Sequence, residues 1–187
     1  MKKHGGLSLI ELMMTLAIVS ILYFVAIPNG YQIYARHKAS ATINELLGQL
    51  EFARTLALAQ GRYISVCASG DNQSCGDNWS RGLYIFADPD INGVIESPGQ
   101  IIRVFDRAND QATITLNAGL NINYINYTPT GTSFRKNSGG NLVYCSRAGE
   151  TRNAKVIIFF RTGRAYLGRD RNGNGIPENG SGNDINC

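Results

Sequence analysis

The sequence predicts an α+β protein in which one long, kinked amino-terminal helix packs on an antiparallel β-sheet head. Helical periodicity of apolar residues extends as far as Gly61, and short β-branched and aromatic runs separated by glycine, asparagine and proline follow it. The chain has 187 residues, of which 43% are apolar, so it holds one ordinary domain plus an appendage.

The first part of the helix has the length and composition of a membrane anchor. Residues 7–26 are twenty residues with a single charged side chain, that of Glu11. As a helix they measure about 30 Å, which is enough to cross a bilayer. Lys2 and Lys3 precede this run, so the positive-inside rule places the amino terminus in the cytoplasm. We therefore expect residues 7–27 to anchor an exported body in the membrane.

Small residues precede this apolar run instead of following it. Gly5 and Gly6 come directly before it, whereas an ordinary secretory signal has its small-residue cleavage site after the apolar stretch. This order resembles the class III signal of type IV pilins and type II secretion pseudopilins. The resemblance implies that prepilin peptidase removes residues 1–6 as a leader, cutting between Gly6 and Leu7, and methylates Leu7. Glu11 and Pro28 then stand where this family carries its glutamate and its helix-kinking proline.

A carboxylate inside an apolar span needs a partner, because a charge at mid-membrane costs roughly 2.5–3.5 kcal/mol on translocon scales. A bare anchor gives no reason for Glu11. The pilin resemblance implies that Glu11 pairs with the positively charged amino terminus of a neighbouring subunit and so sets the register of assembly.

Residues 28–61 continue the helix as an amphipathic segment, and Gly61 is a plausible stop. The expected core-facing positions recur at three- and four-residue steps: Ile33, Ala39, Ile43, Leu46, Leu47, Leu50, Ala53 and Ala57.

Residues 62–187 form the predicted β-rich head with a disulfide-tied tail. Eight strands are expected: 63–68, 82–87, 101–106, 112–116, 122–127, 141–145, 155–161 and 164–168. The tight turn at Thr162-Gly163 favours a meandering antiparallel arrangement. This order of elements resembles the GspH/FimT branch of pseudopilins and minor pilins.

The four cysteines of an exported domain indicate two disulfides, for which three pairings are possible. Cys67 and Cys75 flank a short polar loop and are expected to close it. Cys145 is then left to tie down the terminal Cys187. No two cysteines have the spacing of a C-x-x-C zinc or redox motif.

Two acidic stretches match the first half of a calcium loop. One contains Asp88, Asp90 and Asn92, and the other starts at Asp170. Both lack the glutamate at the twelfth loop position. Asx turns are the alternative interpretation, because Asp, Asn and Gly make tight connections without a metal.

Basic residues gather towards the carboxy terminus. Between Thr132 and Arg171 nine basic residues face two acidic ones, a local charge of +7 in a chain of net charge +4. Seven of the nine are arginines, whose planar guanidinium groups suit phosphate oxygens. A solvated face is the alternative, as is a contact with the acidic residues between Cys67 and Asp110 of the next subunit.

The segment Gly168-Arg169-Asp170-Arg171 resembles the Gly-Arg-any-Arg signature of FimT-like minor pilins that bind DNA in natural transformation. The glycine would let the backbone approach DNA, and two arginines at a two-residue spacing project to one side of an extended segment. The implied DNA-binding residues are Gly168, Arg169 and Arg171, with Arg152, Arg161, Arg164 and Lys136 in support.

The sequence is therefore expected to encode a minor pilin of a type IV pilus whose head binds double-stranded DNA for uptake. The alternative is a structural subunit without DNA binding, either a minor pilin that primes assembly or a type II secretion pseudopilin. No enzyme and no cofactor are expected, because the two histidines, His4 and His37, lie outside the head and no acid pair or nucleophile with a base can be assembled. Other pilins, prepilin peptidase and the inner membrane are the remaining expected partners, with the head in the periplasm and then on the pilus.

Overall fold

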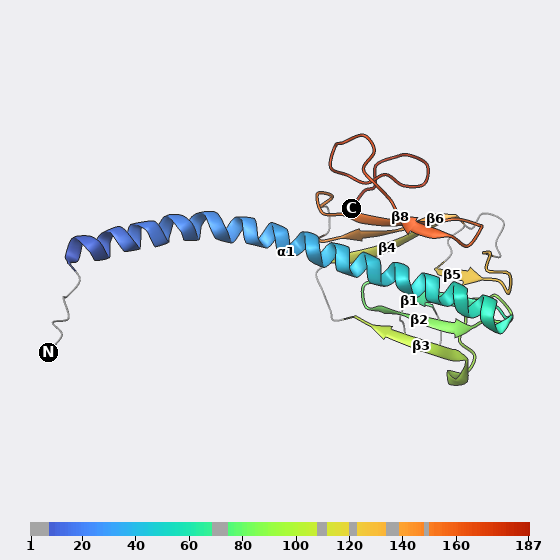
Figure 1. The fold of residues 1–187 in the computed structure, drawn as a ribbon. Helices are drawn as coiled ribbons and strands as arrows, with labels where there is room; N and C mark the ends of the chain where they lie inside the picture. The colour runs from blue at the N-terminus through green and yellow to red at the C-terminus, as the bar shows by residue number, and fades with distance from the viewer. Residues whose placement is uncertain (1–7, 69–74, 108–111, 120–122, 134–138, 148–149) are drawn as a thin grey trace. The chain divides into compact units, whose positions relative to one another are not determined.

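The structure, a computed structural model, describes residues 8–68, 75–107, 112–119, 123–133, 139–147 and 150–187, apart from the side chains of residues 25–31. One long helix, α1 (Leu9–Gln60), precedes the strands (Figure 1). The chain forms two compact units, Met1–Lys38 and Ala39–Cys187. Helix α1 contributes its first part to one unit and its second part to the other.

Helix α1 ends where the sequence predicts. Gly61 adopts a φ of 62°, a left-handed conformation that glycine tolerates without a steric penalty. The N–H of Arg62 then donates to the carbonyl of Ala57 at 3.3 Å, which is the hydrogen bond of a Schellman cap.

The eight described strands form two antiparallel sheets. Every predicted strand is present, and the predicted and observed ends differ by two residues at most. Sheet A has the order β3-β2-β1-β5, with β3 (Ile101–Asp106), β2 (Gly82–Ala87), β1 (Ile64–Ala68) and β5 (Tyr124–Tyr127). Sheet C has the order β4-β6-β7-β8, with β4 (Thr113–Ala118), β6 (Gly140–Cys145), β7 (Lys155–Phe159) and β8 (Ala165–Leu167). A single 3-10 turn, Pro98–Gln100, precedes β3.

The strand order differs from the predicted meander. Strand β5 pairs with β1 and strand β4 pairs with β6, so neighbours in the sheets are not always neighbours in the chain. Alternation of apolar residues reveals that a segment is a strand, but it does not reveal which strand lies beside it. The two sheets enclose one core, so each strand can bury an apolar face without pairing with its successor.

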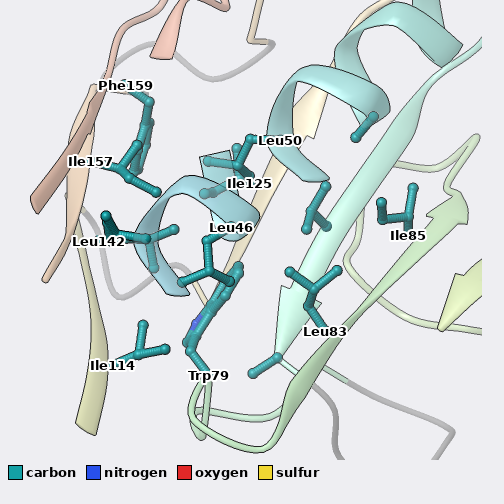
Figure 2. Packing of buried hydrophobic residues seen from close by; sticks show 14 of the residues in the cluster. Leu46, Leu50, Trp79, Leu83, Ile85, Ile114, Ile125, Leu142, Ile157 and Phe159 are labelled. Atoms are coloured by element: carbon teal, nitrogen blue, oxygen red, sulfur yellow. The ribbon is translucent and has the colours of Figure 1, made fainter. Parts of the chain in front are cut away.

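The core lies where the second part of α1 meets both sheets. Figure 2 shows Leu46 and Leu50 of the helix between Leu83 and Ile85 of sheet A and Leu142 and Ile157 of sheet C. All the predicted helix positions from residue 39 onward are buried except Leu47, which is half-buried, whereas Ile33 is exposed. A fully buried leucine or isoleucine contributes about 1.5–3 kcal/mol, so this helix face is the main support of the head.

The carboxy-terminal tail packs on sheet C away from the main core. Ile185 joins a second apolar cluster with Val143, Val156 and Ile158, and Ile176 borders it. The disulfide between Cys145 and Cys187 joins the tail to β6. The tail therefore has an apolar anchor of its own, which the sequence did not indicate.

Candidate nucleic-acid interface

The arginines predicted to bind DNA lie around the β7–β8 hairpin. Arg161 and Arg164 belong to its turn rather than to the strands, since the Phe160 N–H donates to the Arg164 carbonyl at 2.9 Å and the Gly163 N–H donates to the Phe160 carbonyl at 2.8 Å. Arg152 precedes β7, whereas Arg169 and Arg171 follow β8.

The structure divides these arginines between the two ends of the hairpin. The turn carries Arg161 and Arg164, and the opposite end carries Arg152, Arg169 and Arg171. Arg169 follows Arg164 by five residue steps of extended chain, which span about 16 Å. The hairpin therefore presents two basic ends rather than one cluster.

All five arginine side chains are exposed. Within the described part of the chain, none of their guanidinium groups has a hydrogen-bond or ion-pair partner. Lys136, the remaining residue of the predicted set, lies outside the described residues. Exposed guanidinium groups without internal partners are available to an external anion.

The backbone of the Arg169–Arg171 segment is fixed by Glu178. The N–H of Arg171 donates to both carboxylate oxygens of Glu178, at 3.0 Å and 2.8 Å, and the N–H of Asn172 donates to Oε1 at 3.1 Å. The N–H of Glu178 donates in turn to the carbonyl of Arg169 at 3.1 Å. Glu178 is buried, with 5% of its surface exposed. These bonds hold the two arginines at a defined place although their side chains extend into solvent.

Asp170 does not neutralise its arginine neighbours. Its Oδ1 accepts a hydrogen bond from the N–H of Gly173 and its Oδ2 accepts one from the N–H of Gly175, both at 2.7 Å. The carboxylate therefore stabilises the loop that follows.

Gly168 has a packing role that the sequence did not indicate. A Cβ at this position would lie 2.8 Å from the Glu178 carbonyl oxygen and against Cγ1 of Val156. The residue is half-buried between β7 and the tail. The glycine is needed because protein atoms of β7 and the tail approach the backbone here.

At the amino terminus, Ser8 caps helix α1. The N–H of Glu11 donates to Oγ of Ser8 at 3.3 Å, and the glutamate is exposed in the first turn of the helix. Gly6, Leu7 and the side chain of Pro28 lie outside what the structure describes. Among the described residues, no helix meets the length and apolarity required to cross a membrane.

Two protein-family models match the chain. Residues 42–162 match the family described as type II transport protein GspH, and residues 1–22 match the prokaryotic N-terminal methylation motif. The chain belongs to the GspH family. It is a minor pilin or pseudopilin, and the methylation motif implies processing by prepilin peptidase, anchoring in the membrane and assembly with other pilins.

Two crystal structures share the fold of this GspH-family chain. Both are of the type IV minor pilin FimU from Pseudomonas aeruginosa, in space groups P21 and P65. The first has a TM-score of 0.56 and 24% identity, over 72% of this chain and 90% of FimU. The second has a TM-score of 0.54 and 25% identity, over 70% of this chain and 92% of FimU. No curated protein matches the chain.

The GspH match ends at residue 162, so it does not include the segment from Arg164 to Arg171. Membership of the family therefore supports the pilin fold without assigning a role to these arginines. Their function has to be argued from their own geometry.

The two predicted disulfides of this GspH-family protein are present in the structure. Cys67 is bonded to Cys75, and Cys145 is bonded to Cys187. The described cysteines include no free thiol.

The first acidic loop contains an Asx turn at Asn92, whose Oδ1 accepts a hydrogen bond from the N–H of Val94 at 2.8 Å, and Asp88 closes the loop. Asp88 is fully buried and accepts hydrogen bonds from Oγ of Ser65 at 2.6 Å, from the N–H of Asn92 at 3.2 Å and from the N–H of Gly93 at 3.1 Å. Nearby, hydrogen bonds from Gln100 and then Asn92 lower the pKa of the exposed Glu96. The described residues contain no group of three acidic, histidine or cysteine side chains that could hold a metal ion.

The sequence prediction missed Glu178 as a residue that positions the arginines. A signal was present, because Glu178 closes the second calcium-like stretch that starts at Asp170. The carboxylate of Glu178 accepts the backbone N–H groups of Arg171 and Asn172.

Proposed function

We propose that this minor pilin binds double-stranded DNA through phosphate contacts, without sequence preference, for uptake in natural transformation. One observation carries the proposal. Arg169 and Arg171 have exposed side chains without internal partners, while Glu178 fixes the backbone between them. Because the backbone is already fixed, the two arginines can bind phosphates without the additional cost of ordering the segment that carries them.

The hairpin turn extends this contact. Arg161 and Arg164 lie about 16 Å from the Arg169 end, a distance over which a duplex presents several phosphates. Arg152 reinforces the contact made by Arg169 and Arg171, and Lys136 is expected to assist. Three or four phosphates then supply the affinity, and no base contact is needed.

A structural role is the second candidate, and the family match favours it. In that case the chain primes a type IV pilus or serves as a type II secretion pseudopilin, and the arginines contact neighbouring subunits. The two functions differ in whether Arg169 and Arg171 are needed for DNA binding, for assembly, or for both.

Maturation in this proposal follows the family motif. Prepilin peptidase removes residues 1–6, Leu7 becomes the methylated amino terminus, and Glu11 and Pro28 act in assembly. Residues 7–27 hold the protein in the inner membrane with its head in the periplasm until it enters the pilus. The mass of the membrane-extracted protein should show a chain that starts at Leu7, whereas an intact Met1 in functional pili contradicts this maturation.

The DNA proposal is tested by titrating duplex DNA into the full-length protein in a neutral detergent. Binding in the micromolar range is expected, and log affinity should fall with log salt at a slope near −3, from about −0.9 per phosphate neutralised. Replacing Arg169 and Arg171 together by glutamine should lower affinity at least tenfold. The slope of log affinity against log salt should become shallower by the amount expected for about two phosphate contacts. Transformation should fall while pilus assembly persists.

A matched control distinguishes binding at Arg169 and Arg171 from a general effect of net charge on DNA affinity. Replacing Arg62 and Arg81 together by glutamine removes the same charge from exposed positions outside the interface. This variant should bind duplex DNA within about twofold of the unmodified protein. Equal affinity of both double variants would refute the interface, and lost assembly in the Arg169 and Arg171 variant would favour the structural role.

A further inference from the structure

The face of sheet C opposite the main core carries a row of side chains defined by strand register. Asn117 pairs with Asn141, Asn141 with Ile158, and Ile158 with Tyr166. Their chain neighbours Leu116, Leu142, Ile157 and Leu167 point to the other side, where they contact the main core. The row therefore crosses all four strands on the outer face, and Nδ2 of Asn117 donates to Oδ1 of Asn141 at 3.0 Å.

The carboxy-terminal tail covers only part of this face. The apolar cluster around Ile185 lies over β6 and the first part of β7. Phe160, just beyond the end of β7, and Tyr166 of β8 remain 40% and 38% exposed. Their rings stack, with centroids 5.5 Å apart and planes at 26°. A stacked pair of exposed aromatic rings is left outside both cores.

A cavity adjoins the Phe160 ring of this pair. It has a volume of about 560 Å³, and its lining includes Phe160, Arg161, the strand residues Asn117 and Asn141, and the tail residues Asn179 and Ser181. Arg164 stands opposite Phe160 in the hairpin turn. The volume falls in the range of small-molecule sites, roughly 300–1,000 Å³.

We infer that this surface binds unpaired bases of single-stranded DNA, such as those at a single-stranded end of a duplex. The inference rests on the proposed function, since it specifies the form of DNA that a second part of the interface accepts. An aromatic face can stack on any base, as on sheet surfaces that bind single strands. The amides of Asn117, Asn141 and Asn179 offer donors and acceptors to a base edge, and Arg161 and Arg164 bind the adjoining phosphates.

The charges of this surface favour a nucleic acid over a protein neighbour. None of the residues that line this cavity is acidic, and Arg161 and Arg164 have no guanidinium partner among the described residues. The adjoining pocket that includes Tyr166 contains Arg169 and Arg171 as well as Glu51 and Glu178. Elsewhere in the head, the exposed ring of Phe52 is covered by the guanidinium of Arg103, 4.5 Å from its centroid. The Phe160 and Tyr166 pair stacks without such a cation and lies beside two arginines, so it can accept both a base and its phosphate.

The test compares three probes: a blunt duplex, the same duplex with a single-stranded thymine overhang, and single-stranded oligothymidylate. The full-length protein should bind the overhang duplex about tenfold more tightly than the blunt one. Replacing Phe160 and Tyr166 together by leucine keeps apolar volume but removes the rings. Binding of oligothymidylate and the overhang should then weaken five- to tenfold, with the blunt duplex changed less than twofold. Replacing Phe52 by leucine is the matched control and should change nothing.

Tryptophan fluorescence gives an independent measurement. The chain has a single tryptophan, the buried Trp79, so a Phe160→Trp variant adds a reporter in the exposed pair. Oligothymidylate should quench the added fluorescence, while the unmodified protein should show no such change. This measurement decides the inference even where the double leucine variant fails to fold.

The outcomes separate this inference from the proposed function. Equal binding of blunt and overhang duplexes, with no quenching, overturns the inference and leaves duplex binding intact. Absence of binding to every probe overturns both. An effect of the leucine variant on pilus assembly, with unchanged DNA binding, assigns the surface to a neighbouring subunit and also overturns the inference.

Discussion

The buried carboxylate of Glu178 binds the backbone N–H of Arg171 with both oxygens, at 3.0 Å and 2.8 Å. Glu178 thus fixes the backbone of Arg171 without forming an ion pair with its guanidinium group. The guanidinium of Arg171 stays free for an external anion, although a carboxylate lies directly beneath its backbone.

Replacing Glu178 by alanine should weaken DNA binding several-fold. Its removal leaves the N–H groups of Arg171 and Asn172 without their acceptor, and a hydrogen bond to a charged group contributes about 1.5–3 kcal/mol. Net charge alone predicts the opposite direction, because a negative charge beside the DNA is lost. The sign of the affinity change in a salt titration therefore decides between positioning and simple electrostatics.

Glu150→Gln is the control for this prediction. Glu150 is exposed, belongs to the same basic region and accepts a long side-chain hydrogen bond from Ser146, at 3.4 Å. Its replacement should leave affinity unchanged or slightly raise it. Tighter binding by both variants would show that Glu178 does not position the arginines.

Replacing Gly168 by alanine should destabilise the head. The added Cβ would meet Val156 and the Glu178 carbonyl, and crowding of this kind costs about 1–3 kcal/mol. Thermal unfolding followed by circular dichroism measures this loss. Gly48→Ala is the control, because nothing lies within 4 Å of a Cβ there and a helical alanine is favoured by about 1 kcal/mol. The two substitutions should shift the melting temperature in opposite directions.

Much of the fold was predictable because local chemistry decides it. Apolar spacing along the second part of α1, the stop at Gly61 and the positions of the eight strands all follow from residues close in sequence. The pairing of β5 with β1 was not predictable, since it depends on which strands share the core. Burial patterns alone do not carry that information.

The candidate site was predictable in its residues but not in their support. Arginine density identified Arg169 and Arg171, whereas their fixation by Glu178 depends on a turn of the tail that brings residue 178 back to residue 171. The packing role of Gly168 was not predictable either. Its neighbours in the structure, Val156 and Glu178, are distant in sequence or lie across a loop.

Stability of the head should fall at alkaline pH because of Tyr127. Its side chain is 2% exposed, and burial raises the pKa of its phenol well above the usual value, with Arg54 opposing and Glu51 reinforcing the shift. The folded protein keeps the phenol neutral, while the unfolded chain ionises it near pH 10. The contribution of the neutral phenol to the free energy of unfolding is complete below pH 10. It is lost as pH rises through the higher pKa of the folded state, by at most about 1.4 kcal/mol per pH unit.

Urea unfolding between neutral pH and pH 11 measures this dependence. Tyr127→Phe should remove part of the alkaline loss while leaving the other tyrosines and lysines to titrate as before. Identical pH profiles for the two proteins would show that Tyr127 ionises equally easily in the folded and unfolded states.

The two disulfides should differ in their effects on both stability and DNA binding. Cys145 and Cys187 are 42 residues apart and Cys67 and Cys75 are 8 apart. Loop-closure entropy gives about 4 kcal/mol for the first disulfide and ~2.5 kcal/mol for the second. The Cys145–Cys187 disulfide also holds the tail that contains Glu178, so replacing both of its cysteines by serine should loosen the arginine segment.

In that serine variant, duplex affinity should fall and the salt slope should decrease towards the value left by Arg161 and Arg164 alone, about two phosphates. The matched change at Cys67 and Cys75 lies in sheet A and its loop, so it should lower the unfolding free energy without altering the slope. The same titration on both variants separates a tail that positions arginines from a general loss of stability. Equal slopes would mean that Arg169 and Arg171 reach DNA whether or not the tail is tied to β6.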